Sequence, residues 1–145
     1  AIGAVTRMVD MGIPPYLLAA AARAVLAQRL VRRLCPHCRR PAALTEADAR
    51  ALGQPALAGR PAWEAAPAGC PECLGGYKGR TGIHELLPVT PALAEAVRQN
   101  LPPAELRRQA GAAGFRDMLD DGVAKILDGL TSVAEVLRSA GARRN

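Results

Sequence analysis

The chain has 145 residues, of which half are apolar and only 3% aromatic, so it can form one domain, or two small subdomains, with an aliphatic, alanine-rich core. Lysine and arginine outnumber aspartate and glutamate by 19 to 13, which raises nucleic acid, anionic lipid and acidic proteins as partners. The arginines are scattered and alanine is abundant, so we favour a GC-biased genome over nucleic-acid binding as the origin of this surplus.

Membrane insertion and secretion are not expected. No apolar run approaches the roughly 20 residues of a membrane span, and the longest candidate, residues 16–22, is cut by Arg23. No signal peptide opens the chain, so we expect a cytoplasmic protein. Because Ala1 stands directly inside a helical pattern, we also expect a longer parent that continues upstream.

Residues 1–34 are predicted to be helical. Residues 4–11 indicate the end of a helix closed by Gly12, and Pro14 and Pro15 suit the first turn of a second helix. Apolar side chains then recur at every fourth residue, with the arginines mostly off their stripe: Leu18, Ala22, Leu26, Leu30 and Leu34. This spacing predicts an amphipathic helix that ends at the first cysteine.

Residues 35–76 predict a loop-built module rich in Pro, Ala and Gly, with one short helix opened by Thr45 and Asp48. Residues 77–145 predict a short return strand over 79–89, then helices over 91–99 and 103–113 and an apolar stripe over 115–130. Thr131 or Ser132 is expected to cap a last helix, which Gly141 ends before a basic tail. The predicted fold is mainly α, with a small zinc-binding loop module and a short β segment.

Two CxxC pairs carry the clearest chemical signal. Cys35 and Cys38 form CPHC, and Cys70 and Cys73 form CPEC, with 31 residues between the pairs. Each CxxC turn supplies two thiolates, so the four cysteines complete the tetrahedral shell of one structural Zn²⁺. The site would carry a formal charge of about −2, which the neighbouring arginines are expected to offset: Arg32, Arg33, Arg39 and Arg40.

Disulfides and redox catalysis are the alternatives for these cysteines, since CPHC occurs in thioredoxin-like oxidants. Redox CxxC motifs follow a strand and begin a helix, whereas Cys35 is predicted to follow a helix and Pro41 discourages a new one. Zinc is therefore the preferred interpretation.

Two further motifs do not support catalysis. GGYKGRTG at 75–82 is not a phosphate loop, because Gly79 follows Lys78 where that loop needs Ser or Thr. HELLP at 84–88 is not a zinc-protease motif, because Pro88 stands where the second histidine belongs. His84 and Glu85 remain candidates for a local structural pair, and no catalytic or nucleotide-binding residue is predicted.

Four segments together resemble one family: GAVTRMVDMGIPPYLLAA, AQRLVRRLCPHC, CPECLGGYKGRTGIHELLPV and DDGVAKILDGLTSVAEVLR. They look like the C-terminal part of the RecA-like secretion ATPases of the GspE and PilB type, which power type II secretion and type IV pilus assembly. The likeness runs from about Gly3 to Arg138 and leaves about 42–68 unmatched. Arg80, Thr81, Gly82, His84 and Glu85 match the GRTGIHE strip of the family.

The resemblance implies a hexameric cytoplasmic motor, peripheral to the inner membrane, that binds ATP and Mg²⁺ in its upstream core and docks on an inner-membrane platform. This chain alone would lack the ATP site, and it would supply a zinc subdomain (35–76) and helices that couple ATP hydrolysis to pseudopilus assembly and protein export. A pilus-assembly ATPase, a nucleic-acid-binding zinc ribbon and a free-standing thiol oxidoreductase are the alternatives.

Overall fold

A computed structural model describes residues 1–141, which divide into two compact units. Unit 1 consists of residues 1–27 and 85–117, and unit 2 of residues 28–84 together with the described chain from 118 onward. Each unit therefore uses two separate stretches of sequence. The predicted basic tail after Gly141 lies outside the described residues.

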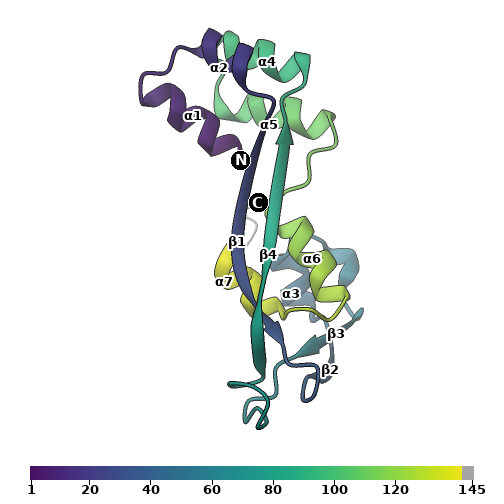
Figure 1. The fold of residues 1–145 in the computed structure, drawn as a ribbon. Coiled ribbons are helices and arrows are strands. Elements are labelled where there is room, and N and C mark those ends of the chain that lie inside the picture. The colour runs from purple at the N-terminus through teal and green to yellow at the C-terminus, as the bar shows by residue number, and fades with distance from the viewer. Residues whose placement is uncertain (142–145) are drawn as a thin grey trace. The chain divides into compact units, whose positions relative to one another are not determined.

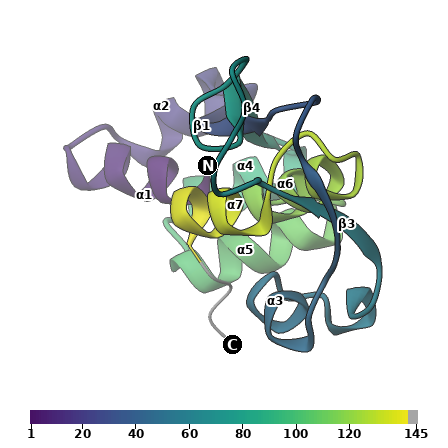
Figure 2. The same cartoon turned by 90° about the horizontal axis from the view of Figure 1, so that it is seen from below.

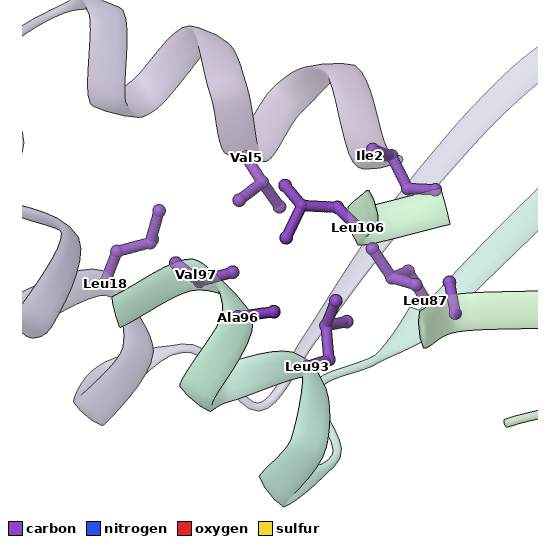
Figure 3. Packing of buried hydrophobic residues seen from close by; sticks show 9 residues of the cluster. Ile2, Val5, Leu18, Leu87, Leu93, Ala96, Val97 and Leu106 are labelled. Carbon is purple, nitrogen blue, oxygen red and sulfur yellow. The ribbon is translucent and has the colours of Figure 1, made fainter. Parts of the chain in front are cut away.

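Unit 1 is helical (Figure 1). Its helices are α1 (Ile2–Asp10), α2 (Pro15–Ala21), α4 (Pro91–Arg98) and α5 (Pro103–Ala112). Helix α4 packs on α2 and α5, and α1 packs on α5. The core between them is aliphatic, with Val5, Leu18, Leu93 and Leu106 among the buried side chains that Figure 3 shows, as the scarcity of aromatic residues predicts.

Unit 2 combines helices with short strands. It contains β2 (Arg40–Ala43), α3 (Glu46–Ala51), the 3₁₀ helix η1 (Pro55–Leu57), β3 (Pro61–Glu64), α6 (Met118–Leu127) and α7 (Val133–Ala140). Strands β2 and β3 are antiparallel, with Arg40 opposite Glu64 and Ala43 opposite Pro61. Helix α6 packs on both β3 and α7, and the chain between β2 and β3, which carries α3, can be followed in Figure 2.

Strands β1 (Ala24–Leu34) and β4 (Tyr77–Pro88) pair in a second two-stranded sheet. The boundary between the two units falls within both strands, after Ala27 in β1 and after His84 in β4.

No helix within residues 1–141 has the length and apolarity that a bilayer crossing requires.

Local signals placed most helix starts correctly. Thr45 and Asp48 form a capping box at α3, since the Asp48 N–H donates to Thr45 Oγ1 while the Thr45 N–H donates to the Asp48 carboxylate. Ser132 caps α7 by accepting from the Glu135 N–H. These caps satisfy N–H groups that have no partner within the helix.

The predicted helix from Pro15 to Leu34 is wrong beyond residue 21. Ala22 is extended, with φ −70° and ψ 128°, and residues 24–34 form β1. A spacing of four residues is even, so it returns to one face of a strand as well as to one side of a helix. Leu26 and Leu30, expected to face a core, are 61% and 50% exposed, and Val31 and Leu34 are the buried residues of this strand.

The fold is thus mainly helical, but its β content exceeds the single short segment predicted. Residues 35–76 contain β2 and β3 in addition to the expected helix, and the return strand β4 begins at Tyr77, two residues earlier than predicted. The helical description of residues 1–34 is corrected to two helices followed by a strand.

Candidate metal centre

The four cysteines of the CxxC pairs come together in unit 2. Their Sγ atoms all lie within 4.8 Å of one another. Cys35 and Cys70 are 3.8 Å apart between sulfurs, whereas Cys38 and Cys73, and also Cys70 and Cys73, are 3.6 Å apart. Four sulfurs at about 2.3 Å from a central ion in a tetrahedron are about 3.8 Å apart, so the cluster has the dimensions of a tetrathiolate metal site.

Backbone hydrogen bonds hold both cysteine pairs in turns. The Arg39 N–H donates to the Cys35 carbonyl at 3.0 Å, and the Cys73 N–H donates to the Cys70 carbonyl at 3.1 Å. The Cys70 N–H also donates to Cys73 Sγ at 3.2 Å. The Cys35 N–H donates to the Gly76 carbonyl at 2.8 Å, which ties the end of β1 to the turn before β4.

Gly76 is needed at this point of contact. Its φ is +81°, and a Cβ placed there would lie 2.7 Å from the Ala66 carbonyl oxygen. Gly69, with φ +67°, is similarly confined, because a Cβ would lie 3.3 Å from Cys73 Sγ. A side chain at either position would displace backbone that positions the sulfurs.

Without a cation the four clustered thiols do not ionise alike. Desolvation and hydrogen bonds with Cys73, Cys70 and Cys35 raise the pKa of Cys38 to about 12. Desolvation also acts to raise the pKa of Cys73, but the Cys70 N–H and the neighbouring thiols lower it to about 7. A divalent cation at the centre would stabilise all four thiolates together.

Two of the four arginines expected to offset the charge of the cluster have partners of their own. Arg32 pairs with Glu135, and Arg39 donates to the Gly129 carbonyl at 2.6 Å and stacks on Trp63 at 4.3 Å. Lys78, which pairs with Glu72 at 3.0 Å, has its pKa raised chiefly by that carboxylate and in smaller part by Cys35 and Cys70. No sequence pattern predicts a role for this lysine beside the cysteines.

The case against redox chemistry also changes. Cys35 follows strand β1, not a helix, so that half of the sequence argument is wrong. No helix begins at the CPHC turn, however, because residues 36–38 form a turn and β2 follows at Arg40. The helix N-terminus that lowers the pKa of a redox thiol is therefore missing there. All four cysteines are free thiols.

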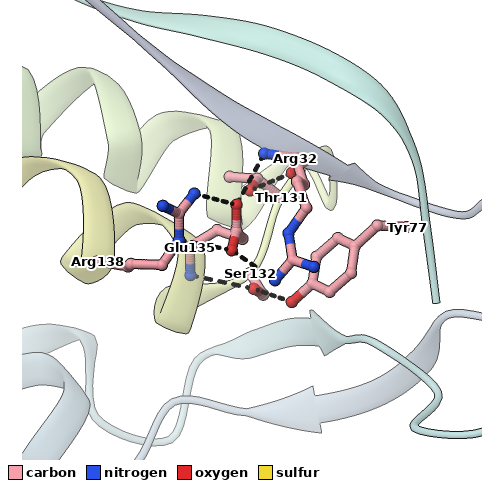
Figure 4. A network of polar contacts seen from close by, with 6 residues as sticks. All are labelled: Arg32, Tyr77, Thr131, Ser132, Glu135 and Arg138. Carbon is pink, nitrogen blue, oxygen red and sulfur yellow. Dashed lines mark hydrogen bonds and ion pairs between the residues drawn. The ribbon is translucent and has the colours of Figure 1, made fainter. Parts of the chain in front are cut away.

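A polar network centred on Glu135 lies in the same unit (Figure 4). The Glu135 carboxylate, 2% exposed, accepts from the Arg32 N–H, the Arg32 guanidinium, and both Nε and a terminal nitrogen of Arg138. Thr131 donates to the Arg32 carbonyl, and the hydroxyls of Tyr77 and Ser132 are 2.9 Å apart. Burial acts to raise the pKa of Glu135, but the bonds from Arg138 and Arg32 lower it to about 2.

The GRTGIHE strip lies in β4, and its residues have different surroundings. His84 donates its backbone N–H to Asp121 at 2.8 Å, and the Asp121 carboxylate also pairs with Lys125. The Nδ1 atom of His84 lies 3.5 Å from the same Asp121 carboxylate, so His84 has a partner other than Glu85. A Cβ on Gly82 would lie 2.6 Å from the His84 ring. The strand conformation of residues 77–88 agrees with rejecting both a phosphate loop and a helical zinc-protease motif.

Comparison with known proteins identifies the family. The family model described as "Type II/IV secretion system protein" matches residues 1–138. Type II secretion system protein E of Aeromonas hydrophila is 46% identical over 143 residues, covering 95% of this chain and 27% of that protein. The type II secretion system protein HxcR of Pseudomonas aeruginosa is 45% identical over 139 residues, covering 95% and 26%. The type IV pilus assembly ATPase PilB of Acinetobacter baylyi is 34% identical over 135 residues, covering 92% and 23%. The chain spans about a quarter of the length of these curated relatives, and it belongs to the family of type II/IV secretion system proteins.

Proposed function

We propose that this chain is the C-terminal zinc-binding and helical region of a RecA-like type II secretion ATPase, and that it couples ATP hydrolysis to pseudopilus assembly and protein export. The observation that carries the proposal is a tetrathiolate cluster within a family match over residues 1–138. Identities of 46% and 45% to type II secretion proteins, against 34% to a PilB, favour secretion over pilus assembly.

Zinc is the metal that this cluster suits best. Four thiolates whose sulfurs all lie within 4.8 Å of one another, three of the pairs at 3.6 to 3.8 Å, match its tetrahedral preference. A shell closed by Cys35, Cys38, Cys70 and Cys73 leaves no position for water or substrate, so the ion is structural and not catalytic. Its binding free energy, on the order of 10 kcal/mol in small zinc modules, would hold the turn at Cys35 to the turn at Cys70.

The rest of the motor belongs to the longer protein in this proposal. ATP and Mg²⁺ bind in the upstream ATPase core, which forms a homo-hexamer in the cytoplasm, peripheral to the inner membrane. The zinc subdomain contacts platform proteins of that membrane, while the helices transmit nucleotide-driven movement. GGYKGRTG lacks the Lys-Ser or Lys-Thr pair of a phosphate loop, which supports placing the ATP site outside this chain.

A nucleic-acid-binding zinc ribbon fits less well. Tyr77 and Trp63, which bases could stack on, are each covered by an arginine at 4.1 and 4.3 Å. DNA affinity that falls steeply with salt would support this alternative, and failure to bind at low salt would exclude it.

Two measurements test the metal and its role separately. The purified chain should hold one zinc per molecule, and X-ray absorption should give four Zn–S distances of about 2.3 Å. In the full-length protein Cys70→Ser should abolish secretion and lower the zinc content, whereas Cys70→His, which restores a ligand of a type that zinc accepts, should recover part of both.

A chain that contains no zinc, and that keeps residues 35–76 folded in chelator, would contradict the metal assignment. If Cys70→Ser removes the zinc and secretion stays normal, the four cysteines are still the metal ligands, but the metal site has no role in coupling. The thiol oxidoreductase alternative requires fast alkylation of Cys35 without chelator, and protection of Cys35 until zinc is removed would exclude it.

A further inference from the structure

Three arginines from separate elements of unit 2 line one pocket. Arg32 comes from β1, Arg80 from β4 and Arg138 from α7, and together with Leu30 they line a solvent-open pocket of about 420 Å³. We call this cavity the Arg80 pocket. Neighbouring guanidinium groups repel one another unless an anion lies between them, so their convergence needs an explanation.

The Glu135 carboxylate orients two of the three arginines, Arg32 and Arg138. It accepts two hydrogen bonds from Arg138 and one from the Arg32 guanidinium, at 2.8 to 3.0 Å. The Arg32 guanidinium also lies over the Tyr77 ring at 4.1 Å. Holding both side chains in advance lowers the entropy lost when a ligand binds to them.

The pocket nevertheless keeps an excess of positive charge. One carboxylate offsets one of three guanidiniums, which leaves about two positive charges at pH 7. Arg80 is exposed, and it forms no ion pair with any residue between 1 and 141. The pocket is therefore complementary to a dianion.

We propose that the Arg80 pocket binds a phosphate-bearing ligand. A phosphate monoester carries close to two negative charges at pH 7, and its oxygens accept from the planar guanidinium fork. A volume of about 420 Å³ also accommodates a substituent on the phosphate. Leu30, which is 50% exposed, offers an apolar wall to the carbon part of that substituent.

The alternative is purely structural: Arg32 and Arg138 join β1 to α7 through Glu135, and Arg80 is a solvated cation. Arg80→Gln distinguishes the two, because it removes one charge from the pocket and leaves every hydrogen bond to Glu135 in place. Its thermal unfolding should match that of the wild type. Arg60→Gln, at an exposed position that does not line the pocket, is the matched control for loss of one arginine.

The test uses the whole zinc-loaded chain at low salt, with two phosphate sources and one acidic peptide. Calorimetry measures binding of pyrophosphate, and co-sedimentation measures binding to phosphatidylcholine vesicles with and without phosphatidic acid, whose headgroup is a phosphate monoester. Arg80→Gln should weaken binding roughly tenfold or more, the loss of one or two charge-assisted hydrogen bonds, while Arg60→Gln stays within about twofold. Binding should also weaken as salt is added.

Each outcome decides one part of the proposal. Pyrophosphate binding without vesicle binding supports a soluble phosphate ester as the ligand, and binding to phosphatidic acid vesicles alone supports a lipid headgroup. Absence of binding in both assays, or an equal effect of Arg80→Gln and Arg60→Gln, overturns the site. Tighter binding of an oligoglutamate peptide than of pyrophosphate overturns the assignment to phosphate.

Discussion

Replacing Glu135 by glutamine should destabilise unit 2 by about 3 kcal/mol. The carboxylate is almost completely buried and lies between Arg32 and Arg138, and its pKa falls from 4.5 to about 2 on folding. At about 1.4 kcal/mol per pKa unit, this shift corresponds to roughly 3 kcal/mol. Removing one partner of a fully buried ion pair costs about 3 to 5 kcal/mol, and because the side chains of Arg32 and Arg138 are 51% and 60% exposed, the cost here should lie at the low end of that range.

The effect should depend on pH in a defined direction. A carboxylate whose pKa is depressed in the folded state contributes its full stability above its unfolded pKa and loses it as pH falls through the folded value. The difference between wild type and Glu135→Gln should therefore be constant near pH 7 and shrink between about pH 4.5 and pH 2. Protonation of the thiolates affects both proteins, so the difference between them is the quantity to compare.

Denaturant unfolding followed by Trp63 fluorescence measures this difference, because the one tryptophan of the chain lies in β3 of unit 2. Glu46→Gln is the control, since its partner Arg50 is 3.7 Å away and both side chains are exposed, which limits the cost to about 0.5 kcal/mol. Equal losses of unfolding free energy for the two variants, or a Glu135→Gln loss that does not change at low pH, would contradict the role assigned to the Glu135 carboxylate.

Packing and backbone conformation give two further predictions, both measured by the same unfolding assay at saturating zinc. Leu52→Ala should lower the free energy of unfolding by about 2 to 5 kcal/mol because Leu52 is fully buried. Leu74→Ala, at an 87% exposed residue, should lower it by less than about 0.5 kcal/mol. Similar losses for the two variants would contradict the placement of Leu52 in the core. Gly76→Ala should cost at least about 2 kcal/mol and weaken zinc binding, because it adds a clash with Ala66 to an unfavourable φ. Gly79 also has a positive φ, but a Cβ there would meet open space. Gly79→Ala should therefore lower the free energy of unfolding by only about 1 to 2 kcal/mol and leave the zinc affinity unchanged. A loss of zinc affinity in Gly79→Ala would count against a role for the Gly76 contact.

The features predicted correctly depend on neighbours in sequence. The helix start at Thr45 needs only Asp48 three residues later, and the start of α7 needs only Ser132. The grouping of the cysteines followed from two CxxC pairs and the coordination preference of zinc. Such signals can be recognised without knowing the fold.

The features missed depend on partners that are distant in sequence. β1 is a strand because it pairs with β4, and the four-residue spacing of its leucines does not reveal that pairing. The role of the Glu135 carboxylate is one of these features. The Glu135 N–H does bond to Ser132, but the carboxylate turns to Arg32, 103 residues away. The i,i+3 spacing of Glu135 and Arg138 was the one local sign of this network.

The split of unit 2 into residues 28–84 and 118 onward has a consequence for biosynthesis. A ribosome releases Cys73 long before Glu135, so both CxxC turns emerge while α7 is still untranslated. The nascent chain can therefore capture zinc before the acidic partner of Arg32 exists.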